Sequence, residues 1–379
     1  MAAISKRATQ PAQHRTKHEH TVLVLQGGGA LGAYQAGAYE GIAEAGLAPH
    51  WVTGVSIGAI NAALIAGNPP QRRVERLRAF WDRVSASAPL ILPAGLDPFR
   101  PAFNRISAAG AIAFGINGFF KPRMPPPFFA ADGSAGALSF YDTEPLKHTL
   151  EELVDFDLIN DHSVRLSVGA VKVRTGDSVY FDNQHAHITS DHIRASASLP
   201  PGFPPVTIAG EEYWDGGIVS NSPLWYVLDD SPRLNALIFQ VDLFSAKGEL
   251  PVNLNQVLER AKDIQYSSKT RFNTKRVKEL RELHHVLGRL LAKLPPELKN
   301  DADGKELARL CAQGDITIAH LINRRLSHSA QSKDYEFSRA TVNDLWAAGL
   351  DDVRHSVAKV DLLRPKDVGL GMRIFDLTR

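Results

Sequence analysis

The stretch of residues 52–62 limits the fold of this chain more than any other part of its sequence. Apolar and β-branched residues lead into Gly54-Val55-Ser56-Ile57-Gly58, and small helix-forming residues follow as far as Gly67. This order predicts a strand, a very tight turn and a helix, with Ser56 at the apex of the turn. A serine in that position takes a strained backbone conformation, and the glycines two places before and after it prevent collisions between neighbouring atoms. The turn exposes the Ser56 hydroxyl beside the N-terminus of a helix.

A glycine-rich loop precedes this turn by one expected helix. Residues 21–25 form a short apolar run that predicts a buried strand, and Gly27-Gly28-Gly29-Ala30-Leu31-Gly32 follows one residue later. A helix is expected from the end of the loop to about Ala45, and a second strand over residues 50–55. Strand, helix and strand in this order form a βαβ unit, so we expect an α/β fold whose sheet is at least partly parallel.

The glycine loop has more than one interpretation. Gly27, Gly29 and Gly32 match the pattern of a dinucleotide-binding fold, but such folds need an acidic residue at the end of the second strand, where this chain has Gly54-Val55-Ser56. A dinucleotide site is therefore disfavoured. The amides of Gly28 and Gly29 can instead form an oxyanion hole, because no Cβ keeps them from turning toward one point. A tight turn for close helix packing is the other alternative, and the serine turn on the next strand favours the oxyanion hole.

Composition limits the class of protein. The 379 residues are 44% hydrophobic and 22% charged with a net charge of +2, which suits a globular protein with a buried core and disfavours a nucleic-acid binder. The single cysteine, Cys311, excludes an internal disulfide and favours a reducing compartment. Residues 1–20 are polar, so we expect a disordered tail rather than a secretory signal. No apolar run is long enough to span a membrane, and the expected location is cytoplasmic, with peripheral contact at the inner face of the membrane left open.

Residues 88–140 differ in amino-acid composition from the rest of the chain. The segment is rich in proline, glycine and phenylalanine and carries few charges. A long irregular segment of this kind inside a domain is usually functional or mobile. We expect either a lid or the rim of an apolar access channel, or a loop whose phenylalanines fill the core.

Short strands and turns follow. The expected strands are residues 164–173, 178–181, 206–208, 212–214 and 234–243, and the fourth of them delivers Asp215-Gly216-Gly217 at its end. From its local sequence alone, an acid followed by two glycines is a turn. From about residue 255 the pattern is helical, and further helices are expected at 305–312, 315–325 and 338–348. Basic residues crowd the stretch 260–281, whose helix lies either on anionic lipid headgroups or in water.

Two other kinds of site fit the sequence poorly. In the ordinary α/β-hydrolase the nucleophilic serine follows several strands and precedes an acid and a histidine, whereas Ser56 ends only the second strand. No histidine lies in a distinctive motif, which argues against a Ser-His-Asp triad. Metal-ligand spacings such as His-Glu-x-x-His do not occur, so we expect neither a metal nor a cofactor.

Four blocks, in order along the chain, resemble those of patatin-like phospholipases. They are Gly27-Gly28-Gly29-Ala30-Leu31-Gly32, Gly54-Val55-Ser56-Ile57-Gly58, residues 197–205 and Asp215-Gly216-Gly217. The resemblance covers about residues 21–244 and implies a three-layer α/β/α fold with a mainly parallel central sheet. It also implies a Ser-Asp dyad in which Ser56 is the nucleophile and Asp215 the base, with residues 27–32 as the oxyanion hole.

The chain departs from the family pattern at one position of the loop. Many patatins have Arg or Lys where this chain has Leu31, but backbone amides do not depend on that side chain. The C-terminal third resembles an extension found in a bacterial subgroup, and Tyr335-Glu336-Phe337-Ser338-Arg339-Ala340-Thr341 carries that likeness. We therefore expect a tail over residues 1–20, a catalytic domain over 21–250 and a helical extension over 251–379.

The expected function is hydrolysis of a lipid ester through an acyl-enzyme, with a phospholipid, a lysophospholipid or a related lipid as substrate and partner. One alternative is an esterase or acyltransferase that acts on a short acyl ester or a hydroxyalkanoate polymer. Another is a catalytically idle, membrane-associated binding protein. An idle site has no physical need for Ser56, Asp215 and the glycine loop together, which argues against the last alternative.

Overall fold

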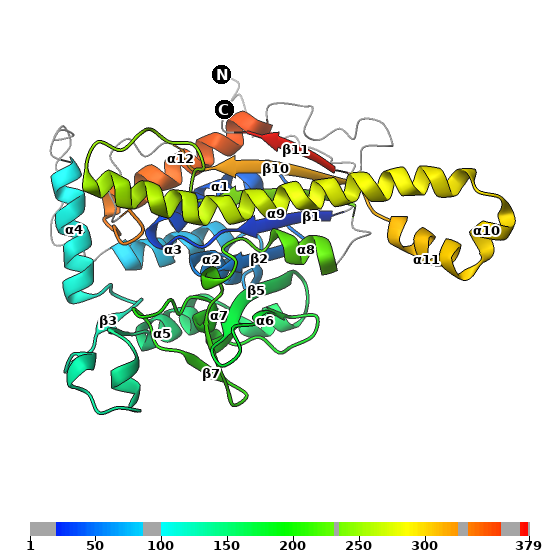
Figure 1. The fold of residues 1–379 in the computed structure, drawn as a ribbon. Coiled ribbons are helices and arrows are strands. Elements are labelled where there is room, and N and C mark those ends of the chain that lie inside the picture. The colour runs from blue at the N-terminus through cyan, green and yellow to red at the C-terminus, as the bar shows by residue number, and fades with distance from the viewer. Residues whose placement is uncertain (1–19, 86–99, 231–234, 325–332, 358–371, 378–379) are drawn as a thin grey trace, which may run out of the picture.

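A nine-stranded sheet forms the centre of the protein (Figure 1). The computed structural model describes residues 20–85, 100–230, 235–324, 333–357 and 372–377. Within these ranges the strands follow the order β11-β10-β9-β1-β2-β5-β8-β7, and β6 pairs with β5 off this path. Their bounds are β1 (His20–Leu25), β2 (Trp51–Val55), β5 (Arg165–Lys172), β6 (Ser178–Asp182), β7 (Val206–Ile208), β8 (Glu211–Asp215), β9 (Ala236–Asp242), β10 (Ile316–Ile322) and β11 (Met372–Asp376). Of the predicted tail, only His20 lies within the described residues, and it begins β1.

Neighbouring strands run parallel from β11 across to β5. The pairs that β5 forms with β6 and β8, and the pair β7–β8, are antiparallel. The expected α/β class with a mainly parallel sheet is confirmed.

Helices cover both faces of the sheet. Leu23 and Leu25 of β1 belong to the larger core cluster, which packs against α1 (Ala33–Glu44), α2 (Ile57–Ala66), α3 (Arg73–Ser85) and α12 (Arg339–Val357). Val22 and Val24 point the other way and pack with residues of α8 (Leu224–Asp230) and α9 (Leu254–Lys293). This alternation follows from the two-residue period of a strand buried on both sides.

The remaining elements lie around this sandwich. They are α4 (Arg100–Phe114), α5 (Glu144–Leu153), α6 (Phe156–Asn160), α7 (Ser190–Ser196), α10 (Pro296–Asn300), α11 (Ala302–Cys311), a small hairpin of β3 (Lys121–Pro122) and β4 (Tyr141–Asp142), and the short turns η1 (Gly29–Gly32), η3 (Pro127–Phe129), η4 (Ala135–Leu138) and η5 (Gly216–Ile218). The long α9 runs across the sheet, and its end projects with α10 and α11 (Figure 1). Among the described helices, none combines the length and apolarity needed to cross a membrane.

Two predictions of secondary structure need correction. Residues 315–325, expected as a helix, contain strand β10, because a seven-residue run rich in β-branched side chains pairs on both edges with β9 and β11. The C-terminal region is mainly helical as expected, but it also contributes two strands to the same sheet as β1. In the segment 88–140, described from residue 100, the 15-residue helix α4 occupies part of what the sequence indicated to be irregular.

Helix α12 of the C-terminal region crosses α1 at two glycines. A Cβ on Gly37 of α1 would lie 1.9 Å from the Trp346 carbonyl oxygen, and one on Gly349 would lie 2.0 Å from that of Tyr34. The Tyr34 hydroxyl also donates to the Asp352 carboxylate at 2.8 Å. The two backbones therefore approach as closely as glycine allows.

We expect Gly37→Ala to lower the free energy of unfolding by about 1–3 kcal/mol or more, because the added methyl group forces the two helices apart. Chemical denaturation of the full chain measures this change. Gly136→Ala is the control, since a Cβ there meets no atom closer than 3.5 Å, and it should shift the free energy by less than about 0.5 kcal/mol. Equal effects from both substitutions would contradict the close packing of α1 and α12.

Candidate active site

Ser56 lies at the turn between β2 and α2 in a conformation that its neighbours enforce. Its backbone has φ 57° and ψ −127°, outside the regions that most residues adopt. A Cβ on Gly54 would lie 2.2 Å from the Gly58 carbonyl oxygen, and one on Gly58 would lie 2.4 Å from that of Leu25. The Ser56 amide donates to both the backbone oxygen and the Oγ of Ser196, each at 3.1 Å. Local sterics and the two hydrogen bonds that the Ser56 amide donates to Ser196 of α7 thus hold the turn.

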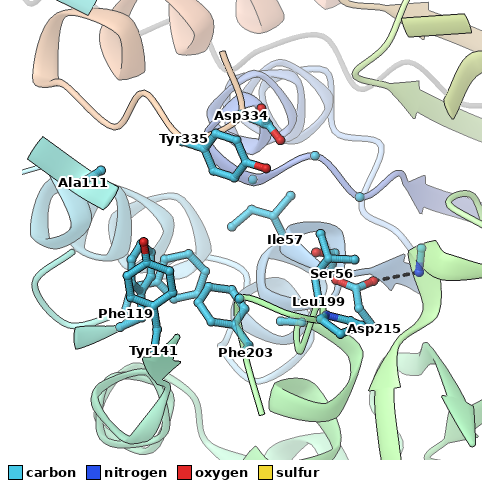
Figure 2. A pocket seen from close by; sticks show the side chains of 18 of the residues that line it. Ser56, Ile57, Ala111, Phe119, Tyr141, Leu199, Phe203, Asp215, Asp334 and Tyr335 are labelled. Atoms are coloured by element: carbon cyan, nitrogen blue, oxygen red, sulfur yellow. Dashed lines mark hydrogen bonds between the residues drawn. The ribbon is translucent and has the colours of Figure 1, made fainter. Parts of the chain in front are cut away.

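Strand β5 brings Asp215 to the same place. Val55, directly before Ser56, lies opposite Gly169 of β5, and Asp215 lies opposite the next residue, Ala170. The two candidate residues, far apart in sequence, therefore reach the sheet within one residue step of each other. The Ser56 side chain lies beside the Asp215 carboxyl group (Figure 2), close enough to influence its pKa.

The environment of Asp215 changes its acidity. The residue is 1% exposed, and its Oδ1 accepts a hydrogen bond from the Gly217 amide at 2.7 Å (Figure 2). Burial raises the pKa of Asp215 to about 7, although the neighbouring Ser56 side chain and the hydrogen bond from the Gly217 amide act in the opposite direction. A carboxyl group with this pKa can accept and return a proton near neutral pH.

The glycine loop, residues 27–32, lies beside the Ser56 turn, and several of its amides already have partners. Those of Gly27, Ala30 and Leu31 donate to the carbonyl oxygens of Asn221, Asp334 and Gly28, at 3.1, 2.9 and 3.2 Å. Gly32 serves packing, since a Cβ there would lie 2.5 Å from the Ile57 side chain. Within the described part of the chain, the amides of Gly28 and Gly29 have no partner, and both residues line a pocket together with Ser56. Of the predicted loop, these two amides are free to bind an anion.

The pocket has a volume of about 410 Å³ and two contrasting ends. Ser56 and Asp215 lie at one end, whereas Phe119, Tyr141 and Phe203 form an aromatic wall at the other (Figure 2). Rings in this wall are in contact, with centroid distances of 5.2 Å for Phe120–Phe203 and 4.8 Å for Phe120–Tyr141. The arrangement places a polar reacting group at the end of an apolar chamber.

Three residues that position the site were not found from the sequence. Ser196 bonds the Ser56 amide, and the Asn221 side chain donates to the Gly27 carbonyl oxygen at 2.9 Å. Asp334 supplies the carbonyl oxygen that holds Ala30, and its side chain pairs with Lys262 at 2.6 Å. Asn221 follows the Asp-Gly motif closely, which is a weak signal, but nothing in the sequence links Asp334 to a loop so far away.

The raised pKa of Asp215 has a consequence for stability. In the unfolded chain this carboxyl group ionises near pH 4, and in the fold near pH 7. Between these values the folded chain holds a proton that the unfolded chain has lost, so the free energy of unfolding falls by about 1.4 kcal/mol per pH unit relative to an uncharged residue. We expect Asp215→Asn to match the wild type below pH 4 and to be increasingly more stable up to pH 7. Denaturation at several pH values measures this, and a constant difference would contradict the burial of an ionisable group.

The chain has recognisable relatives. A family model described as patatin-like phospholipase matches residues 23–228, more than half of the chain, and a second, described as patatin phospholipase, matches residues 264–368. No curated protein matches the chain. Similar solved structures include VipD from Legionella pneumophila, with 15% identity, coverage of 92% of this chain and 67% of VipD, and a TM-score of 0.40.

ExoU from Pseudomonas aeruginosa, solved in complex with SpcU, is 19% identical, and the match covers 78% of this chain and 61% of the other at a TM-score of 0.26. This chain thus spans about three fifths of the length of ExoU. The two family models confirm both the resemblance of the glycine and serine blocks and that of the C-terminal region. The chain belongs to the patatin-like phospholipase family.

Proposed function

We propose that the protein is a serine hydrolase of lipid esters, of the phospholipase A or lysophospholipase type. The observation that carries this proposal is the Ser56 side chain beside the buried Asp215 carboxyl group at one end of an apolar pocket. Membership of the patatin-like family supports a lipid hydrolase. The pocket favours an apolar acyl chain, and the amides of Gly28 and Gly29 favour an oxyanion.

The first half of the reaction forms an acyl-enzyme. Asp215 accepts the proton of the Ser56 hydroxyl, and the serine oxygen attacks the ester carbonyl carbon. The carbonyl oxygen becomes an oxyanion, which the amides of Gly28 and Gly29 stabilise at the positive end of a helix. When the carbon–oxygen bond to the alcohol breaks, Asp215 returns its proton to the leaving oxygen. The acyl group stays on Ser56, with its chain among the aromatic side chains.

The second half repeats these steps with water. Asp215 takes a proton from a water molecule, whose oxygen attacks the acyl carbon, and the same two amides hold the second oxyanion. The bond to Ser56 then breaks, the serine oxygen regains the proton from Asp215, and a fatty acid is released. This sequence needs no histidine.

We expect Ser56→Ala and Asp215→Asn each to lower hydrolysis of a lysophospholipid by at least about 10³-fold, because one removes the nucleophile and the other its base. Neither variant should lose thermal stability relative to the wild type. Intact-mass spectrometry after treatment with a fluorophosphonate should find one adduct on the wild type and none on Ser56→Ala. Undiminished turnover in either variant would refute the dyad.

The pKa of Asp215 sets the pH dependence. The ionised carboxylate is the active base, so kcat/KM should fall about tenfold per pH unit below pH 7 and be constant above it. Initial rates with a soluble short-chain ester measure this profile without the influence of a lipid surface. Ser196→Ala is an informative control, since it loosens the turn but leaves Asp215 in place; it should lower the rate without moving the pH midpoint. A flat profile from pH 5 to 8 would exclude Asp215 as the base.

A further inference from the structure

The segment between β3 and β4, residues 123–140, which we call the aromatic tip, extends away from the sheet (Figure 1). Its large apolar side chains are in water: Met124, Phe128 and Phe129 are 84%, 83% and 80% exposed. Phe114, at the end of α4 just before this hairpin, is 81% exposed. Single exposed apolar residues are common, but a cluster of this kind marks a surface that contacts something apolar.

The backbone of the tip is suited to an apolar environment. Three successive residues are prolines, Pro125, Pro126 and Pro127. They have no amide hydrogen, so no hydrogen bond from these amides to water is lost when the tip leaves water. Two further amides are satisfied within the tip, since those of Phe129 and Ala130 donate to the carbonyl oxygens of Pro126 and Pro127 at 2.9 and 3.1 Å. Removing the exposed phenylalanine side chains from water therefore carries a small cost in unsatisfied polar groups.

The stem of the tip is fixed to the wall of the pocket. The Arg123 amide donates to the Phe140 carbonyl oxygen at 3.0 Å, and the amides of Phe140 and Tyr141 donate to the carbonyl oxygens of Pro201 and Gly202, at 3.2 and 2.9 Å. Phe140 is 39% exposed, packs against Phe128 at a ring distance of 5.8 Å and also lines the pocket. An apolar surface thus continues from the tip into the chamber that contains Ser56.

Cations outnumber acids on the segment that carries the tip. Between residues 100 and 140 the chain carries Arg100, Arg105, Lys121 and Arg123 but the single acid Asp132, and of these Arg100 pairs with Asp344 at 2.7 Å. Arg105 is exposed on α4, and the Lys121 side chain is 62% exposed beside its partner Asp142. Basic residues that flank exposed aromatic ones favour an anionic lipid surface, where the rings enter the acyl layer and the cations stay among the headgroups.

The basic helix considered from the sequence is less suited to this role. Lys262 of α9 pairs with Asp334, and Arg281 is buried and donates to the Gly314 carbonyl oxygen at 2.9 Å. Arg260 donates to the carbonyl oxygens of Ser245 and Ala246. The exposed Lys275, Arg276 and Lys278 pair along the helix with Glu279 and Glu282. Each of these charges therefore has a partner within the protein.

We propose that the aromatic tip inserts into an anionic lipid surface and aligns the mouth of the pocket with it, so that an acyl chain passes from the lipid layer to Ser56 without crossing water. This inference rests on the proposed function for the identity of the substrate. The contact itself follows from the exposed rings, the satisfied backbone and the positive flank.

The test places a fluorophore at the tip. The chain has one cysteine, so Cys311→Ser allows a single new cysteine to be labelled with an environment-sensitive NBD group. One protein carries Phe129→Cys, and its matched control carries Leu290→Cys on α9, where the side chain is 52% exposed. With vesicles of phosphatidylcholine and phosphatidylglycerol, the label at 129 should brighten and shift to the blue, and the label at 290 should not. No response at 129, or a response at 290 alone, would overturn the proposal.

A second measurement tests the energetics with unlabelled protein. Phe128→Ser combined with Phe129→Ser should weaken sedimentation with these vesicles by at least about tenfold, while Leu283→Ser combined with Leu290→Ser should leave it unchanged. Hydrolysis of a soluble short-chain ester should be equal in all three proteins, because neither pair of residues lines the pocket. Equal vesicle binding by the wild type and the tip variant would overturn the proposed role of the aromatic tip in lipid binding but leave the proposed function intact. A response of the label at residue 129 to vesicles, without any ester hydrolysis by the protein, would refute the proposed function and leave the proposed lipid contact of the tip intact.

Discussion

Strands β2 and β8 meet end to end along one edge of β5, with β6 on the opposite edge, and this pairing is the constraint on which the rest of the site depends. Because Gly169 and Ala170 are consecutive, the residues opposite them, Val55 and Asp215, cannot be far apart. Strand β8 is antiparallel to β5, so Asp215 comes at its end, where the parallel β2 also ends. The edge of the sheet at which parallel strands terminate is where α/β proteins commonly build their sites. Here one antiparallel strand adds the acid to that edge.

The C-terminal region is part of this arrangement. It supplies β10 and β11 to the sheet and packs α12 against α1 through Gly37 and Gly349. The Ala30 amide of the glycine loop donates to the carbonyl oxygen of Asp334. Among the described residues, the amides of Gly28 and Gly29 beside Ser56 have no such partner. Phe337 stacks on Trp81 at 6.4 Å and contacts Phe119 of the pocket wall at 5.9 Å. The C-terminal region, in whose sequence no catalytic motif was identified, thus contributes to the shape of the glycine loop and of the pocket.

The polar and the apolar side chains of the pocket lie at opposite ends. At one end, burial raises the pKa of the Asp215 carboxyl group, and this makes its carboxylate a stronger base. At the other end, Phe119 and Phe120 are buried in the wall, while Phe128 and Phe129 of the same segment are exposed at the tip. Phenylalanine therefore serves two different purposes within a few residues. The composition of the segment indicated an apolar role but did not distinguish wall from surface.

The sequence by itself determined the features that depend on steric contacts between residues close together in the chain. The glycines around Ser56 are required by collisions within a few residues, so Gly54-Val55-Ser56-Ile57-Gly58 predicted the turn, and the apolar runs on either side predicted the parallel βαβ unit. Tertiary structure decided the rest. Asp215 is a turn residue by its local sequence, and only pairing with β5 and burial raise the pKa of its carboxyl group. Residues 316–322 form a strand rather than a helix because β9 and β11 flank them, and the Asp334 carbonyl reaches Ala30 only in the folded chain, since no local pattern encodes a contact between such distant residues.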